Sequence, residues 1–309
     1  MNTTFLWIAF NVFVLCAVAI DLGLISRRLH KVSLREAAWT SVAWVGLSVL
    51  FGLGVLHYGG HQQGLQFFTG YLVEKALSVD NLFLFLLIFR TFAIDERLQH
   101  RMLQWGILGA LLMRGVMIAA GAALIEEFSW ILYVLGAFLM YAAIHMLLVK
   151  KEKVHPEQNA IFKFASRHLR VTRGYHGERF FIRSIGKLYA TPLFLVLLVV
   201  EITDVTLAVD SIPAVFGITR DPFIVYTSNV FAILGLRAMY FLLAGVLNRL
   251  RFLTFGLSAV LFFIGAKMIV EPWVHITELI SLAAVGGILL VALVASLLFP
   301  AKPAVEMRA

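Results

Sequence analysis

The sequence predicts an all-α polytopic membrane protein with about nine transmembrane helices, including two inverted three-helix repeats. Composition is the first reason: 61% of the 309 residues are hydrophobic, only 14% are charged, and the mean hydropathy is +0.90. A soluble domain carries about 25% charged residues. Apolar runs of about 20 residues, the length that crosses a bilayer, recur along the chain. Loops with and without basic residues alternate between these runs, as expected for a chain that crosses a membrane repeatedly.

Hydropathy places the spans near residues 5–25, 38–57, 67–89, 103–125, 130–149, 191–216, 222–246, 252–270 and 276–299. Thr191-Pro192 and Asp221-Pro222 each place a capping side chain before a proline, the pattern of a helix start. Glu271-Pro272 ends the eighth span, because proline cannot continue a helix. The resulting division is two N-terminal helices (1–66), a first repeat (67–149), a basic cytoplasmic loop (150–190), a second repeat (191–270), and a last helix with a cytoplasmic tail (271–309).

Most of the net charge of +8 lies in one loop. Residues 150–187 contain ten basic and three acidic side chains, a net +7. A nucleic-acid site is conceivable for such a segment, but a cytoplasmic loop that obeys the positive-inside rule explains it better. Every odd-numbered loop is basic, which places the N-terminus outside the cell and the C-terminus in the cytoplasm. We therefore expect the lipid bilayer, and no nucleic acid, as a partner.

Two short stretches inside the membrane resemble each other. VEKALSVDN (73–81) aligns with TDVTLAVDS (203–211), so each copy holds an acid, five intervening residues, an aspartate and a small polar residue. Each copy precedes a span with a mid-membrane arginine and then a span with an ionisable residue: Arg114 and His145 in the first copy, Arg237 and Lys267 in the second. Three spans is an odd number, so the second copy enters the membrane upside down. This is the plan of many secondary transporters, whose substrate site lies where the repeats meet.

The motif spans carry more acids than the nearby bases can neutralise. The acids are Glu74, Asp80, Glu201, Asp204 and Asp210, and the available bases are Lys75, Arg114 and Arg237. A charged residue at the bilayer centre costs about 2.5–3.5 kcal/mol on insertion scales, so it is retained for a reason. Buried ion pairs that only hold the bundle together would use three of the five acids. A cation pathway uses all of them, and we favour it.

The ligand types indicate a hard cation. Carboxylates together with Asn81 and Ser211 are oxygen donors, which suit Mg²⁺, Ca²⁺ or Mn²⁺ rather than copper or zinc. Helical periodicity puts Glu74 on one face with Asn81, and Asp204 on one face with Ser211. The same periodicity puts Asp210 about 120° away from Asp204 on a straight helix. These acids converge only if the helix bends or unwinds, and Pro213 is placed either to break the helix or merely to kink it.

The stretches GYLVEKALSVDN, LVVVEITDVTLAVDSIPAVF and DPFIVYTSNVFAILGLRAMYFLLAGV resemble the TerC family of bacterial integral membrane proteins, and within it the Alx-like branch. The resemblance extends over nearly the whole chain. It implies a bacterial inner-membrane exporter of manganese, in a family named after tellurite-resistance loci whose Alx-like members are associated with the alkaline response. The family's acids fall on Glu74, Asp80, Glu201, Asp204 and Asp210, with Asn81 and Ser211 beside them.

We therefore expect an exporter that carries Mn²⁺ as its substrate, holds no prosthetic group, and is coupled to protons. In this hypothesis Arg114 and Arg237 pair with the acids of the emptied site. Glu201 has no acidic counterpart in the first copy, where Tyr71 stands, so it is the candidate proton carrier. The alternative is a membrane scaffold or stress-resistance protein with structural ion pairs. An enzyme is not expected, because the sequence offers no activated nucleophile, His-carboxylate metal cluster or nucleotide loop.

Overall fold

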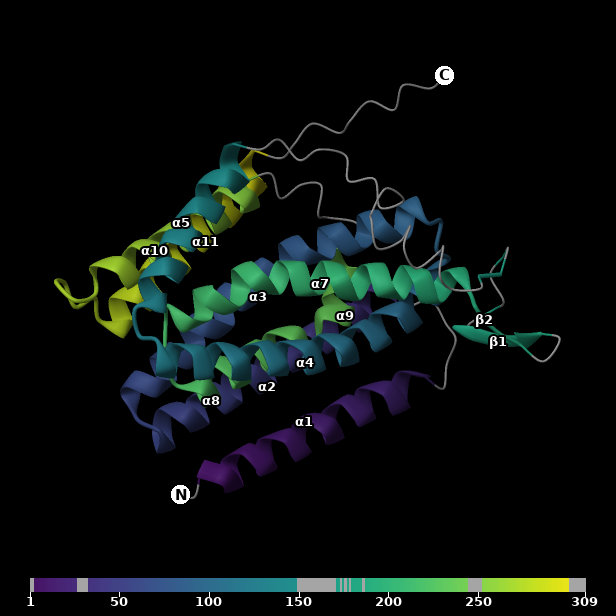
Figure 1. The fold of residues 1–309 in the computed structure, drawn as a ribbon, viewed down its shortest axis with the longest axis horizontal. Coiled ribbons are helices and arrows are strands. Elements are labelled where there is room, and N and C mark those ends of the chain that lie inside the picture. Colours follow the sequence, from purple (N-terminus) through teal and green to yellow (C-terminus); the bar gives the residue numbers. More distant parts are fainter. Residues whose placement is uncertain are drawn as a thin grey trace.

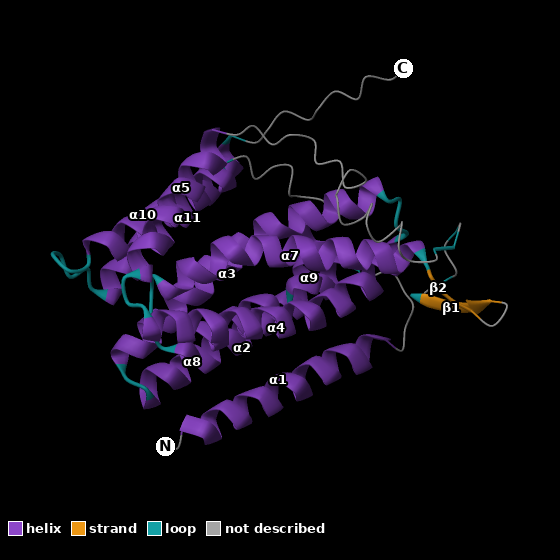
Figure 2. Cartoon of the chain, viewed as in Figure 1, coloured by secondary structure: helices purple, strands orange, loops and turns teal. Residues whose placement is uncertain are grey.

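The computed structural model describes residues 3–26, 33–148, 171–172, 174, 177, 179–184, 187–243 and 252–299. Ten helices and one β-hairpin lie in this part of the chain (Figures 1 and 2). The helices are α1 (Thr3–Ser26), α2 (Leu34–Tyr58), α3 (His61–Thr91), α4 (Glu96–Glu127), α5 (Ile131–Leu148), α7 (Pro192–Phe216), α8 (Pro222–Ile233), α9 (Leu236–Leu243), α10 (Leu253–Val270) and α11 (Glu278–Leu298). The hairpin pairs β1 (Phe181–Ser184) with β2 (Lys187–Ala190) in antiparallel register.

Each range that hydropathy selected contains a helix, and the proline signals mark helix ends as predicted. Helix α7 begins at Pro192, α8 begins at Pro222, and α10 ends just before Glu271. Asp221 caps α8, since its Oδ1 accepts hydrogen bonds from the backbone nitrogens of Phe223 at 2.9 Å and Ile224 at 3.4 Å. Thr191 differs from the prediction. Its hydroxyl donates to the Arg179 carbonyl at 2.8 Å instead of capping α7.

The seventh predicted span is broken in two. Helices α8 and α9 are inclined by 42° across Leu234 and Gly235. Gly235 has φ +84°, a left-handed conformation that only glycine adopts without strain. A β-carbon at this position would also lie 2.9 Å from the Trp44 side chain of α2. Hydropathy could not separate the two segments, because both sides of the glycine are apolar.

Helix α7 contradicts one expectation. It continues through Pro213 to Phe216, so the helix break predicted at Pro213 is absent. The proline lies in the last turn, where its missing N–H removes one bond to the preceding turn. The chain closes that turn with a bond of 2.9 Å from the Gly217 nitrogen to the Pro213 carbonyl. Asp210 is therefore not turned towards Asp204 by an unwound segment.

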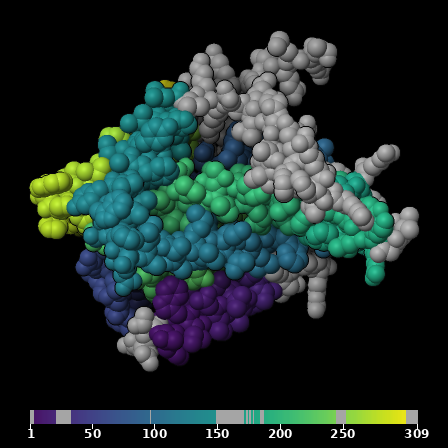
Figure 3. Space-filling model, viewed as in Figure 1, coloured from purple at the N-terminus to yellow at the C-terminus, as the bar shows by residue number. Residues whose placement is uncertain are grey.

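The helices form two groups (Figure 1). Helices α3, α4, α7 and α8 pack together at the centre, with α2 and α9 against them, whereas α5, α10 and α11 form an inclined group beside α3 and α7. Helix α1 covers one side of the bundle, at the bottom of Figure 3, through the buried side chains of Phe10, Val14 and Val18. Among the described residues, six helices are long and apolar enough to cross a bilayer, or seven if α8 and α9 count as one bent span. This confirms a polytopic helical membrane protein.

Residues 150–170 of the predicted basic loop (150–190) lie outside the described residues, as do 173, 175–176, 178 and 185–186. Its end is described and forms the hairpin of β1 and β2, which joins the start of α7 (Figure 2). The nitrogen of Thr191 donates to the carbonyl of Phe180 at 2.9 Å and so ties the hairpin to the helix start.

Candidate functional site

A buried polar cluster lies between the central helices, with Arg114 of α4 at its centre. The Arg114 side chain is 2% exposed and the side chain of Glu74, on α3, is fully buried. Asp204 of α7 is buried beside them. Three elements that are far apart in the sequence thus bring one cation and two carboxylates together in the interior of the bundle.

Arg114 contacts three oxygen-bearing side chains. Its Nη2 donates to Asp204 Oδ1 at 3.2 Å and its Nε donates to Asp204 Oδ2 at 3.3 Å, a two-pronged pairing that suits a guanidinium. Its Nη1 donates to Glu74 Oε1 and, at 3.4 Å, to Asn229 Oδ1 on α8. The cluster therefore joins α3, α4, α7 and α8 through a single side chain. We call Arg114, Glu74, Asp204 and Asn229 the Arg114 cluster.

Small residues let the helices that carry the cluster approach closely. A β-carbon on Gly70 of α3 would lie 2.9 Å from Ser228 Oγ of α8. Ser211 of α7 donates its hydroxyl to Glu74 Oε1 at 3.4 Å, so two of the predicted site residues meet directly. Aspartate and glutamate are seldom fully buried unless they are paired in this way.

Several polar atoms of this region still lack a partner. Within the described part of the chain, no hydrogen-bond partner is found for Glu74 Oε2, Ser78 Oγ or Asn229 Nδ2. Ser78 follows Glu74 by one turn of α3 and shares its face. A buried polar atom without a partner costs about 1–3 kcal/mol. Glu74 Oε2 and Ser78 Oγ thus keep lone pairs that no described residue uses, whereas Asn229 Nδ2 is a donor.

The charges of the cluster do not balance. With both acids ionised, one guanidinium faces two carboxylates, and one negative charge has no counterpart within the Arg114 cluster. The nearest base in the sequence, Lys75, donates its Nζ to the Ala232 carbonyl at 3.2 Å, about one turn of α8 beyond Asn229. Arginine pairing alone therefore does not explain why both acids are buried here.

The other predicted site residues lie around the cluster but outside it. Asn81 is buried on α3, and Asp80 beside it is half-buried. Asp210 is half-buried on α7 and interacts electrostatically with His145 of α5. Arg237 is buried at the start of α9, just after the break. No group of three or more His, Cys, Asp or Glu side chains in the described ranges is arranged to hold a metal ion.

Glu201 lies one turn before Asp204 and is half-buried. Its carboxylate packs directly on Gly109 of α4 and leaves no room for a β-carbon there. The two acids are close enough to repel each other. Glu201 thus stands beside the Arg114 cluster with a separate contact to α4, as a neighbour of the site rather than a member of it.

The sequence analysis missed Asn229. This residue is fully buried and belongs to a polar triplet, Thr227-Ser228-Asn229, inside the apolar helix α8. Three successive polar residues in such a run are a signal of their own. Asn81 and Ser211 were predicted because they adjoin the acids of the aligned motifs, whereas Asn229 has no acid beside it in the sequence.

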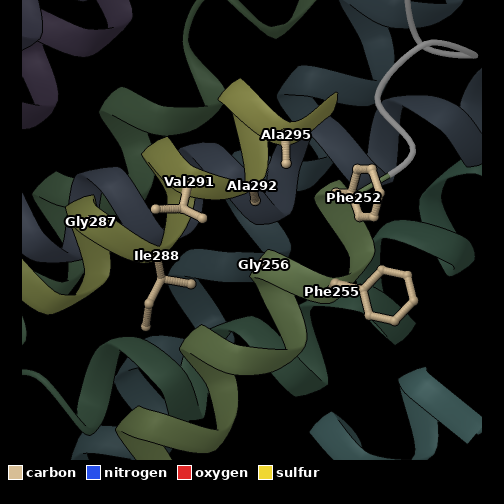
Figure 4. Close-up of a pocket in the computed structure, with 8 residues that line it drawn as sticks. All are labelled: Phe252, Phe255, Gly256, Gly287, Ile288, Val291, Ala292 and Ala295. Atoms are coloured by element: carbon tan, nitrogen blue, oxygen red, sulfur yellow. The ribbon is translucent and has the colours of Figure 1, made fainter. Parts of the chain in front are cut away.

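Two of the cavities in the described part of the chain differ in their chemistry. One, of about 310 Å³, is polar and opens where α3 begins and α7 ends; it is lined by Gln66, Thr219, Asp221, Glu271 and Glu278, among others. The other, of about 510 Å³, lies between α10 and α11, and Figure 4 shows only carbon atoms on the side chains that line it. Hard cations bind oxygen ligands, so of these two cavities the polar one has the matching chemistry.

Comparison with known proteins gives a consistent result. The family model described as "Integral membrane protein TerC family" matches residues 59–304. A protein of Photorhabdus laumondii named "Putative membrane-bound redox modulator Alx" is 48% identical over 303 residues, covering 95% of both chains. The protein of the same name in Escherichia coli K12 is 47% identical over 298 residues, 94% of this chain and 93% of its own. An uncharacterized membrane protein of Myxococcus xanthus, STKORF319, is 46% identical over 293 residues, covering 95% and 92%. No solved structure matches the chain.

Proposed function

Because the chain belongs to the TerC family of integral membrane proteins, we propose that it exports Mn²⁺ from the cytoplasm of a bacterium. The observation that carries this proposal is the Arg114 cluster, in which two buried carboxylates and an amide oxygen meet inside a membrane protein. Oxygen ligands of this kind suit Mn²⁺ and other hard divalent cations. Intramembrane acids mark an ion pathway more often than they hold a bundle together.

The proposed architecture has nine spans, which are α1, α2, α3, α4, α5, α7, the bent pair α8 and α9, α10 and α11. In it, α3 to α5 and α7 to α10 form two inverted repeats. The packing supports this arrangement: α3 contacts α8 while α4 contacts α7, and the third helices, α5 and α10, pack along each other. A two-fold axis in the membrane plane would relate these pairs. The start of α3 and the end of α7 line one cavity, so these two helices run in opposite directions.

The proposed topology puts the N-terminus outside and the C-terminus in the cytoplasm, so the polar cavity opens outwards. Gln66 at this cavity and Glu74 in the cluster lie on the same helix, eight residues or about 12 Å apart. The ion would leave the cluster along this face of α3. Asp80, Asn81 and Asp210 are proposed to contact the ion at other stages of transport, since they lie on the same helices as the cluster acids.

Export needs a source of energy. Moving two charges outwards against a potential of 100 mV, negative inside, costs about 4.6 kcal/mol. We propose that protons moving inwards supply it and that Glu201 carries them, because its carboxylate lies next to Asp204 yet outside the pairing with Arg114. In this proposal the protein has no prosthetic group and catalyses no covalent reaction.

The alternative is a scaffold or stress-resistance protein whose buried charges only stabilise the bundle. The relatives named as redox modulators raise a related possibility. This chain contains one cysteine, Cys16, so a disulfide within one chain cannot form. We favour transport because structural pairing leaves one carboxylate of the Arg114 cluster uncompensated.

The test measures manganese in a bacterial strain that lacks the protein and in the same strain complemented by wild type, Asp80→Asn or Asp210→Asn. Wild type should lower cellular manganese, and both variants should fail to do so. Flux assays with Mn²⁺, Ca²⁺ and Mg²⁺ in liposomes then establish selectivity. Unchanged manganese with wild type, or full activity of both variants, would contradict the proposal.

A further inference from the structure

We infer that Asn229 is a further ligand of the transported cation, and that Arg114 is an internal cation which the transported ion displaces from the same oxygens. This inference rests on the proposed function. It adds a residue outside the acidic motifs and a reason for an arginine in the middle of the site.

The first argument is geometric. Four oxygen atoms from three helices accept hydrogen bonds from one guanidinium: Glu74 Oε1, Asp204 Oδ1 and Oδ2, and Asn229 Oδ1. Oxygens that surround one positive group face a common volume. Ser211 Oγ borders it through its bond of 3.4 Å to Glu74 Oε1. With Glu74 Oε2 added, the region offers the approximately six oxygens that octahedral coordination of Mn²⁺ requires.

The second argument concerns the amide of Asn229. Its oxygen must face Arg114, because the amide nitrogen and the guanidinium are both donors and would oppose each other. The nitrogen is consequently directed elsewhere, where no described residue accepts its hydrogens although the side chain is fully buried. An asparagine needed only to hold Arg114 could use both ends of its amide. A bonded oxygen and an unbonded nitrogen are what we expect of an asparagine whose oxygen is the functional atom, as in a metal ligand.

The third argument is charge. One guanidinium compensates one of the two carboxylates, whereas a divalent ion compensates both. The ion and the guanidinium cannot occupy the same volume, so the side chain of Arg114 must move when the ion binds. Glu201 offers it a second carboxylate, one turn from Asp204 and against α4 at Gly109. Return of Arg114 to the cluster would release the ion and keep the emptied acids paired.

The experiment measures Mn²⁺ affinity of the purified full-length protein in nanodiscs by titration calorimetry, beside Mn²⁺ flux in proteoliposomes. Arg114→Gln removes the competing charge, so we expect Mn²⁺ to bind about tenfold more tightly or better, while flux falls by about tenfold or more because nothing displaces the ion. Equal or weaker binding by folded Arg114→Gln protein would overturn the role of Arg114. If Arg114→Gln does not fold, the Mn²⁺ affinity of Arg114→Lys is measured instead. It keeps the charge but loses the fork, and its affinity should exceed that of wild type by about threefold; unchanged affinity would overturn the inference.

Asn229 is tested by Asn229→Leu, which keeps the size of the side chain and removes its oxygen. Affinity for Mn²⁺ should fall by about tenfold. The matched control is Thr227→Val on the same helix, since the Thr227 hydroxyl bonds to the Ile224 carbonyl and not to the cluster; its affinity should stay within about twofold of wild type. Equal affinities of Asn229→Leu and wild type would contradict ligation.

The outcomes separate the inference from the function on which it rests. Mn²⁺ flux through wild type with no gain of affinity in the arginine variants overturns the inference and leaves the exporter standing. Absence of both Mn²⁺ binding and flux in wild type overturns the proposed function and the inference with it.

Discussion

Arg114 and Lys267 are both buried cations that pair with acids, but their surroundings differ. Lys267 of α10 donates to Glu278 Oε2 at 3.5 Å, one base facing one acid. Gln66 donates to the other oxygen of Glu278 at 3.1 Å and accepts a bond of 2.8 Å from Thr219. Each of these charged or amide groups has a partner. Around Arg114, one base faces two acids, and polar atoms of Glu74 and Asn229 have no partner in the described part of the chain.

This difference distinguishes an ion pair that holds helices together from a cluster with more acids than bases. We call Lys267, Glu278, Gln66 and Thr219 the Lys267 network. The Lys267 network links α10, α11, α3 and the loop before α8 at the rim of the polar cavity, and its charges balance. Balanced, fully bonded networks make a structure rigid. In the proposed mechanism, the excess acid around Arg114 allows a second cation to compete for the same oxygens. Burial alone therefore does not identify the site, whereas burial with unbalanced charge does.

The largest effect is expected for Glu74→Gln. This change removes one of the two carboxylates and leaves Arg114 with a balanced pair, which makes the Arg114 cluster resemble the Lys267 network. Loss of a ligand should lower Mn²⁺ flux by at least about a hundredfold, since even outer-shell changes cost about 10–100-fold. This loss is measured as Mn²⁺ flux in proteoliposomes that contain equal amounts of folded protein. Flux close to that of wild type would show that the excess acid has no role in transport.

Gly109→Ala should have the next largest effect. A β-carbon at this position would overlap the Glu201 carboxylate, so Glu201 must move while Glu74 and Asp204 keep their contacts with Arg114. We expect flux to fall by about tenfold, as for other outer-shell changes, with Mn²⁺ affinity little altered. Gly106→Ala on the same helix is the control, because its β-carbon would only reach ordinary contact at 3.6 Å from Val200. Equal flux in the two variants would argue against a role for Glu201.

For Glu278→Gln we expect the opposite pattern, a loss of stability with little loss of Mn²⁺ flux. It leaves the Lys267 side chain, which is 4% exposed, without its acid. Removing one member of a buried pair costs up to about 3–5 kcal/mol, and the 17% exposure of Glu278 lowers our expectation to about 2 kcal/mol. Thermal unfolding in detergent should show this loss, while flux per folded protein falls by less than about threefold. If Glu278→Gln lost as much flux as Glu74→Gln, the Lys267 network would not differ from the Arg114 cluster in its role.

The smallest effect is expected for Ser211→Ala. Its hydroxyl bond to Glu74 is 3.4 Å long, near the limit for a hydrogen bond, so it contributes about 0.5 kcal/mol. Flux should fall by about two- to threefold. Ser228→Ala serves as the control, since that hydroxyl bonds to the Val225 carbonyl within its own helix. A tenfold loss in Ser211→Ala would show that Ser211 contributes more than this one long bond.

The helices of this fold were predictable because the signals that define them are local in the sequence. Features that depend on contacts between distant residues were not predictable. Span-length apolar runs placed the helices, and Asp221-Pro222 marked the start of α8 because capping acts within one turn. The break at Gly235 depends on its contact with Trp44 of α2, which lies 191 positions earlier in the chain and is invisible to periodicity. Pro213 was a misleading signal, since α7 continues through it and ends only at Phe216.

At the site too, the residues could be predicted from the sequence, but the contacts between them could not. Residue type was enough to select Glu74, Asp204, Ser211 and Arg114, because charges and polar groups in apolar runs are rare. Their meeting was not predictable, since Arg114 is 40 positions from Glu74 and 90 from Asp204. Asn229 was missed because an uncharged amide in the second repeat has no counterpart in the aligned motifs. Only packing of α8 against α3 and α4 brings it to the cluster.

The central claim is that the unbalanced Arg114 cluster binds the transported ion, whereas the balanced Lys267 network lines the cavity through which the ion leaves and does not bind it. It is tested most directly by Mn²⁺ flux through wild type, Asp204→Asn and Glu278→Gln, reconstituted at equal amounts of folded protein. We predict rapid flux for wild type, a loss of at least about a hundredfold for Asp204→Asn, and retention within about threefold for Glu278→Gln. Full flux in Asp204→Asn, or equal losses in the two variants, would contradict the account.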